Sequence, residues 1–285
     1  MSIAVTFLPR QERASLPPIG FIGGGNMASA IIGGLIKSQV PAATIEVVEP
    51  LAQARERLAH DFGVTAQAEA SSALLRCGVL VWAVKPQSFA QAAQAVRGLA
   101  PDALHLSVAA GIPSDSIARW LGTEQVVRAM PNTPALVGKG MTGLFARPAV
   151  DLVGRKQTEQ VLEATGELLW VDAESDLDAV TAVSGSGPAY VFYFIEALTE
   201  AGIELGLSPE QAHRLATGTF IGASALASES TEEPSVLRER VTSKGGTTYA
   251  AISSLEASEV KTRFKAAIRA AHQRAAELAE EFGRG

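Results

Sequence analysis

The chain has 285 residues and a mass of 29.7 kDa, which predicts about two domains rather than one. Hydrophobic residues make up 47% and charged residues 19%, so the chain can fill a sizeable core and is not globally disordered. The formal net charge is −6 and no basic stripe is visible, which argues against a nucleic-acid partner. The single cysteine, Cys77, excludes an internal disulfide framework and suits a reducing compartment.

The first 18 residues are typical of an N-terminal arm and end in Pro17 and Pro18. They contain neither a basic n-region nor a small-residue cleavage site, so we predict no signal peptide. The stretch between Arg13 and Lys37 has no charged residue and is long enough to resemble a membrane span. Two prolines and six glycines interrupt it, and a strand, a glycine-rich turn and a helix explain these breaks better. We therefore expect a cytoplasmic protein with no membrane partner.

Short apolar runs and segments of helical periodicity alternate over the first half of the chain. Five apolar runs predict buried strands at 19–22, 45–49, 79–84, 104–109 and 125–130. The segments between them predict helices at 26–37, 52–62, 71–76, 89–99 and 114–121. Further strands are expected at 143–147 and 169–172, around a helix at 152–166. Alternation of this kind predicts a parallel, doubly wound sheet with right-handed crossovers.

Beyond about residue 176 the strand pattern stops. Every remaining segment predicts a helix, at 188–205, 209–229, 235–241, 247–255 and 259–282. In the last of these, Val260, Phe264 and Ile268 begin an apolar stripe at alternating three- and four-residue spacing. The chain has no Pro/Ser-rich linker between the two halves, so we expect them to pack firmly.

A glycine-rich sequence follows the first predicted strand and opens the first predicted helix. Residues 23–28 read GGGNMA and match G-x-G-x-x-G/A, the turn that binds a dinucleotide pyrophosphate. Gly23 would permit the tight turn, Gly25 the close approach of the pyrophosphate, and Ala28 the packing of helix on strand. An ordinary strand-to-helix turn is the alternative, but the position between strand and helix favours dinucleotide binding. The predicted cofactor contacts here are Ile22, Gly23, Gly24, Gly25, Asn26 and Met27.

Ligands of open parallel sheets bind outside the carboxyl ends of the strands, so the other strand ends supply further candidates. Glu49 ends the second strand, where a carboxylate would bond a ribose 2′-OH and repel a 2′-phosphate. Arg55 and Arg57 would offset that charge or lie on a solvated helix face, so the cofactor preference stays open. The third and fourth strand ends supply the other predicted cofactor contacts, Ala83, Val84, Lys85, Pro86, Ala109, Ala110 and Gly111. These residue types also occur in ordinary turns.

Two sequences in the helical half place glycines directly before helix starts, at 184–190 and 242–248. Glycines in such positions can expose several N–H groups together, which suits a small carboxylate ligand. The alternative is that the serines and threonines simply cap the helices. The four histidines do not have the spacing of metal ligands, so we predict no metal site. Cys77 precedes a buried strand and is expected to pack rather than react.

Taken together, the motifs resemble those of the pyrroline-5-carboxylate reductase family. The sequences that carry the resemblance are GFIGGGNM at 20–27, AVKPQ at 83–87, AAGI at 109–112, MPNTP at 130–134, AVSGSGPAY at 182–190 and VTSKGGTT at 241–248. They run in the family's order over nearly the whole chain, from residue 19 to about 282. Two departures stand out: Lys244 takes the place of the family's usual proline, and no 2′-phosphate clamp follows Glu49.

The resemblance implies that NADPH, or NADH, reduces the cyclic imine 1-pyrroline-5-carboxylate to L-proline, the last step of proline biosynthesis. The implied catalytic residue is Thr248, whose hydroxyl contacts the ring nitrogen of the substrate. Ser243 and the N–H groups of Gly246 and Thr247 are implied to hold the substrate carboxylate. Glu174 matches a substrate-site acid of the family. The helical domain is implied to form a homodimer, which in some members is part of a ring of dimers.

The predicted fold class is therefore α/β. An N-terminal Rossmann-like doubly wound parallel sheet covers 19–173, and a C-terminal all-helical dimerisation domain covers 174–285. Two alternatives remain for the function. One is another Rossmann reductase with a helical second domain, such as a β-hydroxyacid dehydrogenase or a different cyclic imine reductase, although the helical-domain motifs match this family better. The other is a non-catalytic dinucleotide sensor, against which the intact loop before Thr248 argues.

Overall fold

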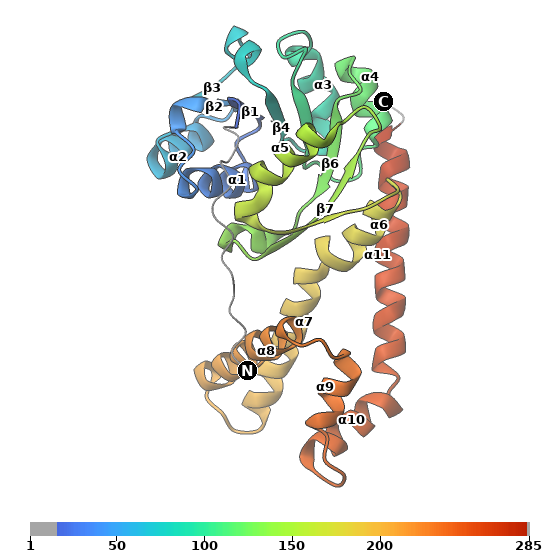
Figure 1. Ribbon diagram of the computed structural model, residues 1–285. Helices are drawn as coiled ribbons and strands as arrows, with labels where there is room; N and C mark the ends of the chain where they lie inside the picture. The colour runs from blue at the N-terminus through green and yellow to red at the C-terminus, as the bar shows by residue number, and fades with distance from the viewer. Residues whose placement is uncertain (1–15, 284–285) are drawn as a thin grey trace, which may run out of the picture. The chain divides into compact units, whose positions relative to one another are not determined.

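The computed structural model describes residues 16–283, and Figure 1 traces their course. They form two compact units. The first, here called the sheet unit, runs through Leu177 and also includes the residues from Leu278 onward. The second, the helical unit, runs from Asp178 to Glu277. The boundary predicted between 173 and 174 lies close to this division. None of the helices within 16–283 combines the length and apolar character that crossing a bilayer requires.

The arm predicted over 1–18 falls outside the described residues as far as residue 15. The residues that follow it pack against the sheet unit. Leu16 contacts the apolar core, and the ring of Pro17 lies against Gly78. Gly78 also donates its N–H to the carbonyl of Pro18 at 2.9 Å, which ties this segment to the start of a central strand.

An eight-stranded sheet forms the centre of the sheet unit (Figure 1), in the order β3-β2-β1-β4-β5-β6-β7-β8. The strands are β1 (Ile19–Ile22), β2 (Ile45–Val48), β3 (Ala66–Gln67), β4 (Val79–Trp82), β5 (Leu104–Ser107), β6 (Val126–Met130), β7 (Gly140–Ala146) and β8 (Gly166–Trp170). The first six strands are parallel to one another. The order reverses between β1 and β4, which is the place where open α/β sheets bind ligands. The predicted fold class is confirmed.

Five helices accompany the strands of this unit. They are α1 (Asn26–Lys37), α2 (Ala52–Phe62), α3 (Pro86–Val96), α4 (Ser114–Leu121) and α5 (Leu152–Leu162). Because side chains alternate along a strand, neighbouring residues of β1 enter different cores. Phe21 joins one buried cluster with Ile31 of α1, and Ile22 joins a second cluster with Phe89 of α3. Both faces of the central strands are therefore covered, which explains their unbroken apolar sequences.

One edge of the sheet departs from the parallel arrangement, because β7 runs antiparallel to β6. Residues 131–139 join the two strands and contain only a short 3-10 turn, η3 (Thr133–Val137). A connection between two parallel strands needs a crossover of a dozen or more residues. This connection is shorter, and β7 therefore runs back antiparallel to β6. The helix predicted at 71–76 is likewise a 3-10 turn, η2 (Ser72–Arg76). The two-residue strand β3 is too short for its periodicity to be seen in the sequence.

A buried histidine lies in β5. His105 accepts a hydrogen bond at Nδ1 from the indole N–H of Trp82, at 3.0 Å. Burial lowers the pKa of His105 from 6.5 to about 4, and a hydrogen bond with the backbone of Ala100 opposes this only in part. The imidazole is therefore neutral in the folded protein at pH 7.

We expect His105 to make the protein less stable as the pH falls from 6.5 towards 4. In this window the unfolded imidazole binds a proton and the folded one does not, so protonation favours unfolding. Urea unfolding at several pH values, followed by tryptophan fluorescence, measures the effect. His105→Gln is the control, because its side-chain oxygen can still accept the Trp82 N–H while the group no longer titrates. If the free energy of unfolding had the same pH dependence in both proteins, His105 would not be the group responsible.

The helical unit follows a short entry segment. Helix α6 (Asp176–Val180) continues into a π-helical turn, η5 (Thr181–Gly185). The unit then contains α7 (Gly187–Glu204), α8 (Pro209–Glu229), α9 (Pro234–Arg240), α10 (Thr247–Ala257) and most of α11 (Val260–Gly283). A capping box, in which Ser208 and Gln211 exchange hydrogen bonds, starts α8. Gly202 of α7 faces Ala212 of α8, and these small residues let the two helices pack closely.

The helical unit leaves much of its apolar side-chain surface uncovered. The side chains buried within its described residues are alanines: Ala182, Ala212, Ala216 and Ala275. Many of its large apolar side chains are exposed, among them Val183, Phe192, Tyr193, Leu205, Leu215, Ile221 and Leu226. Exposed apolar side chains in such number indicate an interaction site, because a monomer rarely leaves large apolar patches in contact with water.

Candidate active site

The glycine-rich turn connects β1 to α1. Gly23 has a positive φ of 97°, and a Cβ there would lie 2.6 Å from the carbonyl oxygen of Ala83, so a side chain does not fit. Gly25 is the N-cap of α1 and differs, because a Cβ there would meet nothing within 4 Å. The first bond within the helix runs from the N–H of Ser29 to the carbonyl of Gly25. The N–H groups of Asn26 and Met27 therefore have no acceptor within α1.

No side chain caps this start of α1 among the described residues. Uncapped N–H groups beside an open glycine form a site for an anionic group, because the helix dipole favours negative charge there. The arrangement fits the pyrophosphate of a dinucleotide. The turn thus has the geometry that its sequence predicts.

A groove of about 730 Å³ lies beside this turn. Its lining comes from the ends of β1, β2 and β4, from the segment after β3 and from α3, and includes Ile22, Gly23, Val48, Pro50, Ala68, Glu69, Val84 and Ser88. Its volume is typical of a small-molecule site. Three lining residues, Ile22, Gly23 and Val84, are among the predicted cofactor contacts. Sequence reasoning missed Ala68, Glu69 and Ser88, because β3 was not predicted and Ser88 lies inside the first turn of α3.

The other predicted strand-end residues lie in different surroundings. Lys85 is exposed and is the N-cap of α3, and Pro86 is the first residue of that helix. Ala109 is buried. Gly111 has a positive φ of 74°, and a Cβ there would lie 3.2 Å from the ring of Phe282. The last turn of α11 therefore packs against the loop after β5, and Gly111 is not part of the groove lining.

Glu49 directly follows β2, and the residue is 7% exposed. Its carboxylate accepts the N–H of Gly24 at 2.7 Å and the N–H of Leu51 at 2.8 Å. Arg55 does not pair with this carboxylate but donates to the backbone carbonyls of Glu49 and Pro50. The predicted contact of Glu49 with a ribose hydroxyl stays a prediction. Of the two alternatives left open for Arg55 and Arg57, an offset of the Glu49 charge is not what Arg55 provides, because its guanidinium binds backbone carbonyls.

Glu174 lies near the end of the first of the two chain stretches that form the sheet unit. Its carboxylate accepts the N–H and the hydroxyl of Ser114, both at 2.6 Å, and the guanidinium of Arg128 at 2.7 Å. Since Ser114 is the first residue of α4, Glu174 caps that helix from 60 residues away in the sequence. The side chain of Arg128 is only 9% exposed. The substrate-site role that the family resemblance implies for Glu174 stays a prediction.

We expect Glu174→Gln to lower the melting temperature by several degrees. The variant keeps the shape of the side chain but loses the charge that pairs with the nearly buried Arg128, and buried ion pairs are costly to break on one side. Thermal unfolding measures the change. Glu159→Gln serves as the control, because that exposed carboxylate accepts the indole N–H of Trp170 at the surface. An unchanged melting temperature in Glu174→Gln would show that the pair does not stabilise the fold.

The second candidate region is the start of α10 in the helical unit. Gly246 donates its N–H to the carbonyl of Ser243 at 3.0 Å and closes a turn in which Gly245 has a φ of 76°. The N–H of Gly246 is therefore used within its own turn, and its predicted bond to a substrate carboxylate stays a prediction. The first bond within the helix runs from Ala250 to the carbonyl of Gly246. The N–H groups of the intervening residues, at 247–249, have no acceptor within α10.

The predicted residues Ser243, Thr247 and Thr248 are brought together around this turn. The Ser243 hydroxyl lies beside the Cα of Gly246, since a Cβ there would be 2.8 Å from it. No side chain of the described residues caps α10. Thr247 is exposed and Thr248 is half-buried. The capping alternative is thus not observed, and the free donors lie one to three residues beyond Gly246.

The motif at 184–190 does not form a loop before a helix. The N–H of Ser186 donates to the carbonyl of Thr181 at 2.8 Å, so the π-helical turn leads directly into α7. The hydroxyl of Tyr190 donates to the carbonyl of Ala182 at 3.1 Å and closes over the turn. Helix α7 begins at Gly187, and Pro188 lies in its first turn, so the helix start predicted at Pro188 is confirmed to within one residue.

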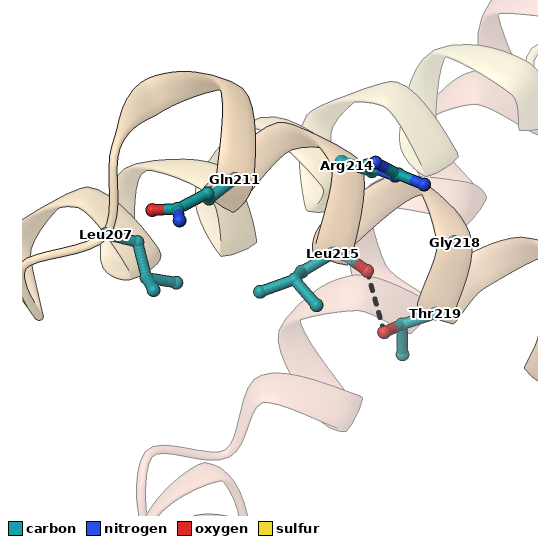
Figure 2. Close-up of a pocket in the computed structure, with 6 residues that line it drawn as sticks. All are labelled: Leu207, Gln211, Arg214, Leu215, Gly218 and Thr219. Carbon is teal, nitrogen blue, oxygen red and sulfur yellow. Dashed lines mark hydrogen bonds between the residues drawn. The ribbon is translucent and has the colours of Figure 1, made fainter.

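A further hollow, of about 490 Å³, lies on α8. Figure 2 shows the residues that line it, Leu207, Gln211, Arg214, Leu215, Gly218 and Thr219. The Thr219 hydroxyl donates to the carbonyl of Leu215 at 2.8 Å and so adds no free polar group (Figure 2). Only one of the six lining residues is charged, and two of them, Leu207 and Leu215, are exposed apolar side chains. This hollow fits a protein interface better than a catalytic site.

A metal centre and a reactive cysteine are two other kinds of site that side chains of this kind can form. Within 16–283 no three His, Cys, Asp or Glu side chains gather as the ligands of a metal ion would. Cys77 is buried, and this burial raises the pKa of its thiol to about 11. A thiol with so high a pKa forms little thiolate at neutral pH and is a poor nucleophile.

Comparison with known proteins adds to this geometry. Residues 174–278 match the family profile described as pyrroline-5-carboxylate reductase dimerisation, and residues 18–111 match NADP oxidoreductase coenzyme F420-dependent. A pyrroline-5-carboxylate reductase of Pseudomonas aeruginosa is 47% identical over 271 residues, which cover 94% of this chain and 99% of that protein. The chain belongs to the pyrroline-5-carboxylate reductase family. The reductase of Escherichia coli is 37% identical, with 93% and 98% of the two chains covered.

Solved structures of this family have the same fold. A pyrroline-5-carboxylate reductase of Coxiella burnetii superposes with a TM-score of 0.87 at 38% identity, covering 93% of this chain and 99% of that one. The pyrroline carboxylate reductase of Plasmodium falciparum, with NADP bound, has a TM-score of 0.83 at 27% identity, covering 92% and 98%. The helical unit corresponds to the dimerisation domain of the pyrroline-5-carboxylate reductases. Its exposed apolar side chains fit a homo-oligomer.

Proposed function

We propose that this protein is an NAD(P)H-dependent pyrroline-5-carboxylate reductase, which reduces 1-pyrroline-5-carboxylate to L-proline as the last step of proline biosynthesis. The observation that carries the proposal is the open, uncapped helix start at Gly25, in a chain of this reductase family. A reductase needs a site for a dinucleotide and a second site for a small anionic substrate. The two uncapped helix starts, of α1 and α10, are suited to these two groups.

The reduced nicotinamide supplies the hydride when the cofactor is bound. Gly25 would face the pyrophosphate, and the N–H groups of Asn26 and Met27 would donate to it. The groove beside the turn, with Val48 and Ala68 in its lining, would hold the adenosine part. Lys85, exposed at the start of α3, would supply positive charge at the same edge of the sheet. These are the residues that we propose to position the cofactor.

The substrate carboxylate would bind at the start of α10. The N–H groups of Thr247, Thr248 and Tyr249 are the free donors there, and the Ser243 hydroxyl lies next to them. Lys244, exposed in the turn, adds a positive charge that favours an anionic ligand. The Thr248 hydroxyl would bond the ring nitrogen of the imine. Little acid–base chemistry is needed from the chain, so its contribution is mainly to orient two reactants.

We infer a homodimer built through the helical unit, in which exposed side chains such as Phe192, Leu215 and Ile221 become buried against a second copy. Assembly of such dimers into a ring is a further proposal by analogy with the family. We also propose a cytoplasmic location, which suits an enzyme of amino-acid synthesis with a single, buried cysteine.

The test is an assay of the purified protein with 1-pyrroline-5-carboxylate and either NADPH or NADH. We expect oxidation of the reduced cofactor, measured by its absorbance, in step with formation of L-proline measured separately. A protein that binds the cofactor but does not consume it with this imine would be the dinucleotide sensor instead. Consumption with a different cyclic imine alone would show that the substrate assignment is wrong.

A further inference from the structure

The carboxylate of Glu49 is nearly buried and bonds to the glycine-rich turn rather than to a cation. One oxygen accepts the N–H of Gly24 at 2.7 Å and the other accepts the N–H of Leu51 at 2.8 Å. A buried charge is costly unless hydrogen-bond donors compensate it, and charge-assisted bonds to N–H groups are stronger than neutral ones. The two N–H groups therefore fix the position of the carboxylate, and the carboxylate fixes the conformation of the glycine-rich turn.

The packing around Gly24 makes this contact close. A Cβ on Gly24 would lie 2.8 Å from Leu58 of α2 and 3.1 Å from the Cγ of Glu49. The backbone of Glu49 is itself fixed, because its N–H donates to the carbonyl of Gln67 at the end of β3, at 2.8 Å. The neighbouring glycine is fixed as well, by the bond from the N–H of Gly23 to the carbonyl of Val48. The edge of the sheet thus sets the conformation of the turn through Glu49.

We propose that Glu49 is a positioning residue, whose carboxylate turns the N–H of Gly24 into the protein and so keeps Gly25 and the start of α1 open to the pyrophosphate. This inference rests on the proposed cofactor site. It differs from the role expected of an acidic residue at the end of the second strand, which is to choose between a 2′-hydroxyl and a 2′-phosphate. A positioning residue acts on the pyrophosphate, which NADH and NADPH share, so its loss weakens both cofactors alike.

The first experiment uses Glu49→Gln, with Glu46→Gln as the matched control. Glu46 lies in β2, three residues before Glu49, but pairs with the exposed Arg76. The dissociation constants of NADH and NADPH are measured by fluorescence titration without imine, and kcat is measured at saturating cofactor. We expect both dissociation constants to rise by about tenfold or more in Glu49→Gln, as loss of a charge-assisted bond predicts. The ratio of the two constants and kcat should stay nearly constant, and Glu46→Gln should resemble the wild type.

A second measurement needs no variant. In the wild-type protein without cofactor, the amide hydrogen of Gly24 should exchange slowly with solvent, because the Glu49 carboxylate accepts it. The amides of Asn26 and Met27, which have no acceptor in the helix, should exchange fast. Exchange at Gly24 as fast as at Asn26 would overturn the proposal even if Glu49→Gln did not fold.

The titrations also separate this inference from the proposed function. Tighter binding of NADPH with unchanged binding of NADH in Glu49→Gln would overturn the positioning role and make Glu49 a filter for the 2′ group. Unchanged binding of both cofactors would overturn it as well. Failure of the wild-type protein to bind either dinucleotide would instead remove the cofactor site itself, and with it the proposed function.

Discussion

Gly25→Val is expected to leave the fold intact and to raise the dissociation constant of either cofactor by about a hundredfold or more, roughly 2.7 kcal/mol. A Cβ at Gly25 meets nothing within 4 Å, and its φ of −74° is accessible to valine. The added side chain would therefore project into the space proposed for the pyrophosphate, at the start of α1. Fluorescence titration of the reduced cofactor, together with a melting curve, measures both parts of this expectation.

The neighbouring glycines are the controls for this experiment. Gly24→Val places its Cβ 2.8 Å from Leu58, and Gly23→Val strains a residue whose φ is 97°. Both variants should unfold at lower temperature than the wild type, whereas Gly25→Val should not. If a well-folded Gly25→Val protein bound the cofactor normally, the glycine-rich turn would not be the pyrophosphate site.

Thr248→Ala is expected to lower kcat/KM for the imine by about tenfold or more, while the dissociation constant of the cofactor stays the same. The variant loses the hydroxyl proposed to bond the ring nitrogen, and a hydrogen bond to a charged group contributes about 1.5–3 kcal/mol. Steady-state kinetics with varied imine at saturating cofactor measure the change. Thr248→Ser keeps the hydroxyl and should retain most of the activity.

Thr247→Ala provides the matched control, because this neighbour is exposed and contributes its backbone N–H rather than its side chain to the proposed site. No side chain within residues 16–283 caps α10, so the Thr248 hydroxyl is not needed to start the helix. Thr248→Ala should accordingly melt near the wild-type temperature. A variant that melts early but keeps full specific activity while folded would make Thr248 a structural residue and move the substrate site elsewhere.

The sequence predicted best those elements whose signals are local. Helix α1 begins and ends as predicted, at Asn26 and Lys37, because a glycine turn precedes it and a charged residue ends its apolar face. The bounds of strand β1 also match the prediction, since its four apolar or small residues lie between prolines and glycines, which end a strand on either side. The strand predicted at 143–147 instead spans Gly140–Ala146. Its start depends on the turn after η3, whose glycine, Gly138, adopts a positive φ that periodicity does not reveal.

Only those parts of the candidate site that lie within one continuous sequence motif could be predicted. The glycine-rich turn could be found from residues 23–28 alone. The bond of Glu49 to Gly24 joins residues 25 apart, and that of Glu174 to Ser114 joins residues 60 apart. Contacts at such separations depend on sheet order, which no local pattern contains. The sequence also could not show that the Gly246 N–H bonds within its own turn. A Gly-Gly sequence is compatible with an N–H that faces a ligand and with one that bonds to the backbone.

The C-terminal residues bear on how this protein can be divided for experiments. The ring of Phe282 lies against Gly111, and the carbonyl of Gly283 accepts the hydroxyl of Ser116 at 3.0 Å. The sheet unit is therefore assembled from two separate stretches of chain, one at each end of the sequence. A recombinant fragment that stops at Leu177 would lack the cover over Gly111, whereas one supplemented with a peptide of the final residues would restore it.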